Sequence, residues 1–143
     1  MFHHFNWKNL SLIAGLSWWK LHFEIFADTV RSPQVVIFLE KLLRVIPGKL
    51  LIVWDGLAAH RSRMVTDFLA SLEGRVHALR LPAYAPELNP VEYIWAHLKH
   101  HELPNLCAKD LWSLGDIARQ KLKRMRRRIP LLVACWKQSS LCF

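Results

Sequence analysis

Residues 50–55 are Leu-Leu-Ile-Val-Trp-Asp, and residues 81–95 are Leu-Pro-Ala-Tyr-Ala-Pro-Glu-Leu-Asn-Pro-Val-Glu-Tyr-Ile-Trp. A short, continuous apolar run such as the first is typical of a strand that is buried on both faces of a sheet. Asp55 ends this strand and is therefore expected at the edge of a sheet where open α/β folds bind ligands. Glu92 follows on the first turn of a predicted helix. Two carboxylates on rigid elements predict a divalent-metal site.

The charge of the chain favours a polyanionic partner. Its 143 residues include 20 Lys and Arg against 11 Asp and Glu, which gives a formal net charge of +9. Nucleic acid is the commonest partner of such a protein, and a basic protein without a polyanionic partner is the alternative. The 52% hydrophobic content and the five glycines argue against extended disorder and predict one domain with a substantial core.

Three cysteines, Cys107, Cys135 and Cys142, are odd in number and lack metal-ligand spacing. This pattern favours a reducing compartment over a disulfide scaffold or a zinc site. The apolar run at residues 10–19 resembles a signal peptide only loosely, because no small-residue cleavage site follows it. No apolar run approaches the ~20 residues that a membrane span needs. We therefore predict a soluble, cytoplasmic protein.

Hydrophobic periodicity outside the central stretch predicts a mixed α/β sheet with helices on its faces. Alternating residues predict strands at 9–17, 19–26 and 76–81, and the first two are expected to form an antiparallel hairpin. Helices are predicted over residues 32–45, 61–73, 89–101 and 110–128. The tail from residue 129 is apolar and shows no element.

The central stretch resembles the catalytic core of the mariner-type DDE transposases, in the bacterial insertion-sequence branch. The resemblance is carried by LIVWDGLAAH at residues 51–60 and by LRLPAYAPELNPVEYIWAHLK at residues 79–99. The upstream segments FNWKNLSLIAGL at 5–16 and DTVRSPQVVIFLEKLL at 28–43 are also similar to this family. The resemblance covers residues 5–118, most of the chain.

The resemblance implies a ribonuclease H-like fold and a metal-dependent enzyme that cleaves DNA strands and transfers them to a target. By position, Asp55 matches the second and Glu92 the third of three metal-binding acids, and His60 matches the histidine that commonly follows the second acid. Two Mg²⁺ or Mn²⁺ ions about 4 Å apart would then activate the attacking water or 3′ hydroxyl and stabilise the leaving oxygen. DNA, as transposon ends and target, is the implied partner.

One departure from the family concerns its first acid, which lies on an opening strand upstream of the region matching residues 5–7. We therefore expect a ribonuclease H-like sheet that lacks its first, central strand, and a fragment that is inactive alone. Residues 1–118 would be the partial core, and residues 119–143 a basic helix end and an apolar tail. The open strand edges would pair directly, bind another chain or face solvent. An upstream-encoded half or a full-length transposase is the candidate partner.

Each candidate site residue also has a structural interpretation. Asp55 could cap the following helix, and Glu92 could complete a capping box with Asn89. His60 could be a loop residue instead of one that orients an acid or contacts phosphate. Tyr84 is expected to pack in the structure rather than to stack on DNA.

A basic run extends over residues 119–128, with seven Lys and Arg and no acid. It predicts contacts to the DNA backbone, and a solvated helix face is the alternative. The candidate DNA-binding residues are Lys99, Lys121, Lys123, Arg124, Arg126, Arg127 and Arg128. Two other functions remain open from sequence: a non-catalytic DNA-binding remnant that inhibits full-length transposase, and a ribonuclease H-like nuclease or resolvase unrelated to transposition.

Overall fold

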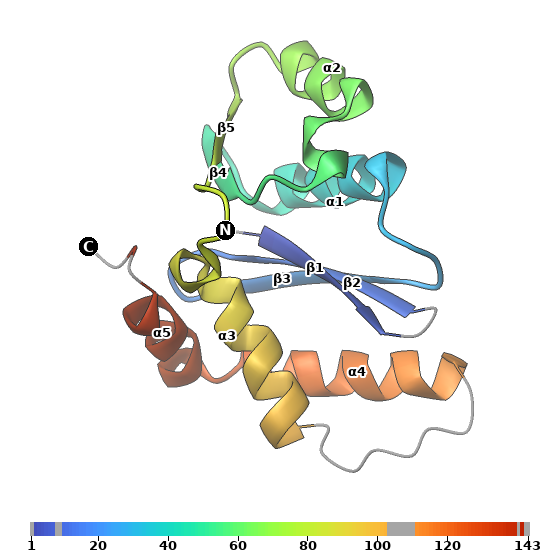
Figure 1. Cartoon of the computed structure of the whole chain (residues 1–143), viewed down its shortest axis with the longest axis vertical. Helices are drawn as coiled ribbons and strands as arrows, with labels where there is room; N and C mark the ends of the chain where they lie inside the picture. Colours follow the sequence, from blue (N-terminus) through green and yellow to red (C-terminus); the bar gives the residue numbers. More distant parts are fainter. Residues whose placement is uncertain (1, 8–9, 103–110, 140, 142–143) are drawn as a thin grey trace.

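A computed structural model describes residues 2–7, 10–102, 111–139 and 141 of the chain. Within these residues one mixed sheet has the strand order β3-β2-β1-β4-β5 (Figure 1). The strands are β1 (Phe2–Trp7), β2 (Leu10–Leu16), β3 (Leu21–Phe26), β4 (Leu50–Trp54) and β5 (Val76–Arg80). β1, β2 and β3 are successively antiparallel, which confirms the predicted hairpin. β4 runs parallel to both β1 and β5.

Helices cover the two faces of the sheet. They are α1 (Ser32–Val45), α2 (Arg63–Ser71), α3 (Pro90–His97), α4 (Leu111–Arg126) and α5 (Ile129–Gln138), with the short helices η1 (Ala58–Arg61) and η2 (Pro86–Leu88) and the π-helical turn η3 (Leu98–Glu102). α1 and α2 lie on one face, and α3, α4 and α5 on the other (Figure 1). None of the helices in the described residues combines the length and apolar composition that a membrane crossing requires.

The helix α5 was missed in the apolar tail. Pro130 stands in its first turn, where proline is compatible with the helix, and Leu132 and Cys135 are buried. Trp136 packs beside them, and its indole N–H donates a hydrogen bond of 2.9 Å to the carbonyl of Ser17. Because nearly every residue of this segment is apolar, its sequence shows no helical periodicity.

The core consists of two clusters separated by β2, all of whose residues are buried. Leu12, Ala14 and Leu16 point toward α3, α4 and α5. Ile13 points the other way, toward the cluster formed by α1, α2 and β4. β2 is therefore the strand that is buried on both faces, and it contributes to both clusters of the core.

A strand occupies the centre of the sheet, where β1 lies between β2 and β4. The prediction that the central strand is absent is therefore wrong. β1 pairs with β2 over its six residues, whereas among the described residues its one pair with β4 joins Phe2 to Trp54. Residues 2–7 contain no Asp or Glu. The central position is thus filled in part, by a strand that carries no acid.

β4 corrects a second prediction, since it is not buried on both faces. Ile52 and Trp54 are buried against α1 and α2, whereas Leu51 on the opposite face is 59% exposed. Leu79 of β5, which pairs with Val53, is also exposed. Parallel strands between helical layers are usually covered on both faces, and this half of the sheet is covered on one.

Candidate active site

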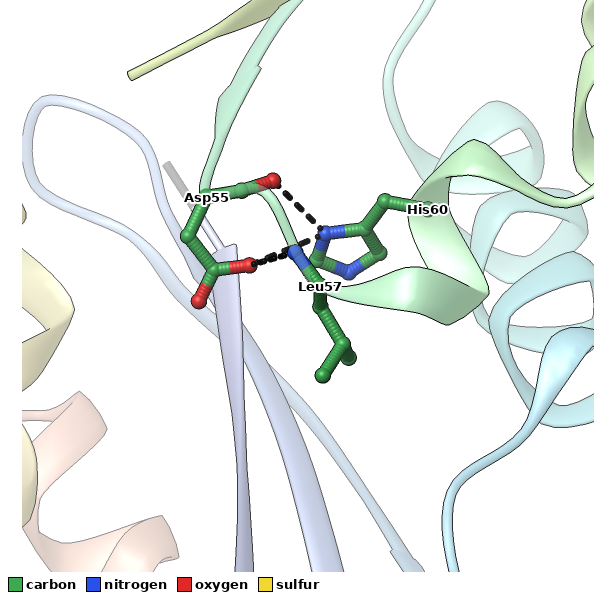
Figure 2. A network of polar contacts seen from close by, with 3 residues as sticks. All are labelled: Asp55, Leu57 and His60. Atoms are coloured by element: carbon green, nitrogen blue, oxygen red, sulfur yellow. Dashed lines mark hydrogen bonds and ion pairs between the residues drawn. The ribbon is translucent and has the colours of Figure 1, made fainter. Parts of the chain in front are cut away.

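Asp55 follows the last residue of β4, where the chain leaves the sheet (Figure 2). The backbone N–H of Leu57 donates a hydrogen bond of 3.0 Å to Asp55 Oδ1. The carboxyl group is about one-third exposed. Asp55 therefore presents a partly accessible carboxylate at the C-terminal edge of a parallel strand, as the sequence predicts, and a main-chain donor fixes its orientation.

His60 lies against Asp55 and is buried, with 1% of its side chain exposed. Its Nδ1 is 3.2 Å from Asp55 Oδ1 and 3.2 Å from the main-chain oxygen of the same residue (Figure 2). The imidazole stacks on Trp54, with ring centroids 4.3 Å apart and planes 6° from parallel. Trp54 was not singled out from the sequence, where it appeared only as one more apolar residue of β4. Packing thus holds His60 in a position that orients Asp55.

Glu92 occupies the first turn of α3 and is half-buried. The buried Asn89 side chain caps this helix by accepting a hydrogen bond of 3.1 Å from the N–H of Val91, which confirms the predicted cap. Pro90 occupies the first turn, and Trp95 is buried in the core. The position of Glu92 is therefore set by a capped helix whose other face is anchored in the core.

A metal site needs several ligands that converge on one ion. Among the described residues, no group of three or more His, Cys, Asp or Glu side chains is placed to hold an ion. Asp55 and Glu92 are oxygen donors of the kind that Mg²⁺ and Mn²⁺ prefer, and Mg²⁺ commonly binds one or two protein carboxylates together with water. By donor chemistry both acids suit such an ion, and within the described ranges they do not belong to a group of three ligands placed to hold one.

Tyr84 corrects a further prediction, because it does not pack. Its side chain is fully exposed on the loop between β5 and α3, and its backbone has a φ of 56°. A positive φ is uncommon in a residue other than glycine. The loop turns at Ala83 and Tyr84 and then forms the short helix η2, and the sequence alone did not indicate the outward direction of the ring.

The basic run belongs to α4 and to the turn that follows it. Leu122 and Met125 are fully buried, while Lys123 and Arg127 are exposed, so the helix has one core face and one basic face. The guanidinium of Arg126 lies 5.1 Å from the ring centroid of Phe23.

Two other candidate DNA-binding residues lie close to α3. The Arg128 side chain lies 3.5 Å from His97 Nε2. Lys99 lies on the π-helical turn η3, beyond the end of the α-helix α3. The candidate residues of the basic run and of the end of α3 are thus brought to neighbouring elements on the same side of the sheet.

Comparison with known proteins defines the class. A family model for DDE superfamily endonucleases matches residues 4–114, and the chain belongs to this family. A search of curated protein sequences gave no match.

Solved structures show the same fold. The Mos1 transposase catalytic domain with raltegravir and manganese has a TM-score of 0.64 at 18% identity, covering 90% of this chain and 72% of that chain. The Mos1 mariner transposase catalytic domain has a TM-score of 0.61 at 17% sequence identity, and the match covers 94% of this chain and 78% of that chain. The Mos1 strand transfer complex has a TM-score of 0.61 at 19% sequence identity, and the match covers 87% of this chain and 42% of that chain. The chain therefore has the ribonuclease H-like fold of transposase catalytic domains.

Proposed function

We propose that this chain is a partial catalytic core of a DNA transposase, in which Asp55 and Glu92 bind Mg²⁺ or Mn²⁺. The observation that carries the proposal is Asp55 itself, held at the end of β4 by the Leu57 N–H and by His60, inside a segment that matches the DDE endonuclease family. When bound, the metal would activate a water or a DNA 3′ hydroxyl for attack on a phosphodiester.

The protein residues have distinct roles in this proposal. His60 and the Leu57 N–H orient the Asp55 carboxylate. The Asn89 cap sets the position of Glu92 on α3. The basic face of α4 would hold the DNA backbone without reading its sequence. Because no acid lies on β1, we expect the chain to be inactive alone and to require a further acid from elsewhere.

The test is nicking of a supercoiled plasmid in Mn²⁺, together with a binding assay on linear duplex DNA. The proposal predicts DNA binding without nicking by this chain alone, and the same DNA affinity for Asp55→Asn. Nicking by the unmodified chain would contradict the expectation that the site is incomplete, and nicking that also occurs in Asp55→Asn would contradict the assignment of the acids. Absence of DNA binding would contradict the assignment of the basic surface.

A second candidate function is a non-catalytic DNA-binding protein, and the exposed basic face of α4 favours it. Replacing Lys123 and Arg127 by Gln removes two positive charges from this face. The slope of log affinity against log salt concentration is expected to fall by about 1.8 in magnitude, about 0.9 per lost phosphate contact. A matched control, Lys49→Gln with Arg63→Gln, removes two exposed charges from the α1–α2 side and is expected to leave the slope nearly unchanged.

A further inference from the structure

A groove with aromatic and basic walls follows β3, the outermost strand at one margin of the sheet. It has a volume of about 420 Å³. Trp19 and Lys20, which precede β3, line it together with Lys41 and Val45 of α1 and Arg126 of α4. Because α1 and α4 pack on opposite faces of the sheet, the groove reaches both faces at the edge that β3 forms.

The charged side chains of this groove are basic. Among the described residues that line it are Lys20, Lys41 and Arg126, but no Asp or Glu. Lys41 also pairs with Glu24, which offsets part of its charge, whereas Lys20 and Arg126 are exposed. Burial lowers the pKa of His22, which also lines the groove, and the nearby positive charges, Lys20 and Arg126 foremost, lower it further. The cations therefore act on a common point, and their combined field favours an anionic ligand.

Trp19 offers an aromatic surface beside these cations, because it is 58% exposed. The adjacent Trp18 packs instead against Trp136, with ring centroids 5.3 Å apart. The guanidinium of Arg126 lies 5.1 Å from the ring centroid of Phe23, so this cation is positioned before a ligand binds. Exposed aromatic rings beside a basic groove are the means by which proteins bind unpaired bases and the phosphates that link them.

The sheet register places the groove level with the end of β4. Trp54 pairs with Phe2, which pairs with Gly15. Gly15 pairs with His22 of the groove, so one row of paired residues crosses the sheet from β4 to β3. Three strand spacings of about 4.8 Å make this row about 14 Å long. Asp55 follows Trp54, and a short single strand at this acid can therefore reach the groove.

We propose that this groove binds unpaired nucleotides of single-stranded DNA, with a base stacked on Trp19 and the flanking phosphates held by Lys20 and Arg126. Duplex DNA fits less well, because its bases stack on one another and offer no free face to the indole. Binding in the groove requires no metal. That the bound strand belongs to a cleaved DNA end rests on the proposed function.

The experiment is fluorescence anisotropy of the full chain with two labelled ligands in metal-free buffer, an oligothymidylate of about 12 nucleotides and a duplex of the same length. Trp19→Ala is expected to weaken oligothymidylate binding at least about fivefold, through loss of one stack between a base and the indole. Trp19→Phe retains a ring and is expected to retain most of the affinity. Trp112→Ala, at an exposed residue of α4 outside the groove, is the matched control and is expected to bind like the wild type.

The duplex separates this proposal from the proposed function. Its affinity is expected to be the same for the wild type and Trp19→Ala, because the basic face of α4 holds the duplex backbone. A wild type that binds the oligothymidylate but no duplex would contradict the proposed function and support the groove as a separate site. A wild type that binds the duplex but no oligothymidylate would overturn the groove proposal alone.

A photocrosslinking measurement uses the wild type and does not depend on the folding of a variant. An oligothymidylate that carries 5-iodouracil is expected to crosslink to Trp19, and mass spectrometry of the digested chain locates the modified residue. Crosslinks confined to residues outside the groove would overturn the proposal, as would equal oligothymidylate affinity for Trp19→Ala and the wild type. Displacement of the oligothymidylate by polyglutamate at the same charge concentration would assign the groove to an acidic polypeptide instead.

Discussion

Replacement of His60 separates the packing of the site from its polar contact. His60→Phe preserves the ring stacked on Trp54 and removes the contacts of Nδ1 with Asp55. Loss of a contact of this kind costs about 1 kcal/mol. His60→Ala also removes the stacked ring and leaves a cavity beside Trp54, and deleting a buried aromatic ring costs about 3 kcal/mol or more. We therefore expect the Ala variant to be less stable than the Phe variant by about 2 kcal/mol.

The assay is urea unfolding and thermal unfolding of the two variants and the wild type, each followed by far-UV circular dichroism. For a chain of this size, the two variants are expected to melt about 3 °C and about 10 °C below the wild type. His100→Ala, on the exposed turn after α3, is the control and is expected to change stability by less than about 0.5 kcal/mol. Equal losses for the Phe and Ala variants would refute the conclusion that packing on Trp54 holds His60 in place.

Three further predictions concern other parts of the structure. Asn89→Ala leaves the buried Val91 N–H without its acceptor and is expected to cost about 2 kcal/mol in urea unfolding, whereas Asn89→Ser retains a capping oxygen and costs less. Burial, aided by nearby Lys and Arg side chains, holds the pKa of His22 below 6.5. The unfolded chain therefore binds more protons, so the free energy of unfolding falls as the pH decreases below 6.5, and His22→Gln flattens this dependence in urea titrations. Burial raises the pKa of Cys135 to about 11, so in a variant whose other two cysteines are serine its thiol reacts with a disulfide reagent at pH 8 only when urea unfolds the chain.

Helices and strands whose ends are marked by local sequence signals could be predicted from the sequence. Asn89 followed by proline fixed the start of α3, and the alternation of residues 19–26 identified β3. Asp55 lies at the end of its strand because an apolar run followed by an acid and a glycine allows few other arrangements. These local signals depend on capping and on periodicity, which a sequence contains directly.

Features that depend on distant parts of the chain could not be predicted. Leu51 is exposed on one face of β4 although Ile52 and Trp54 are buried on the other, and the sequence does not show which apolar side chains of a strand will be covered. The stacking of His60 on Trp54 and the outward direction of Tyr84 follow from loop geometry. The helix α5 was missed because residues that are apolar on every side carry no period.

The most direct test of the central claim is Mn²⁺ binding followed by electron paramagnetic resonance of the free ion. The wild type is expected to bind about one ion, and Asp55→Asn and Glu92→Gln are each expected to weaken binding at least tenfold, because each removes a charged oxygen ligand. Asp67→Asn, an exposed acid on α2, is the control and is expected to bind like the wild type. Equal affinity in all four proteins would contradict the assignment of Asp55 and Glu92 as the metal ligands of this site.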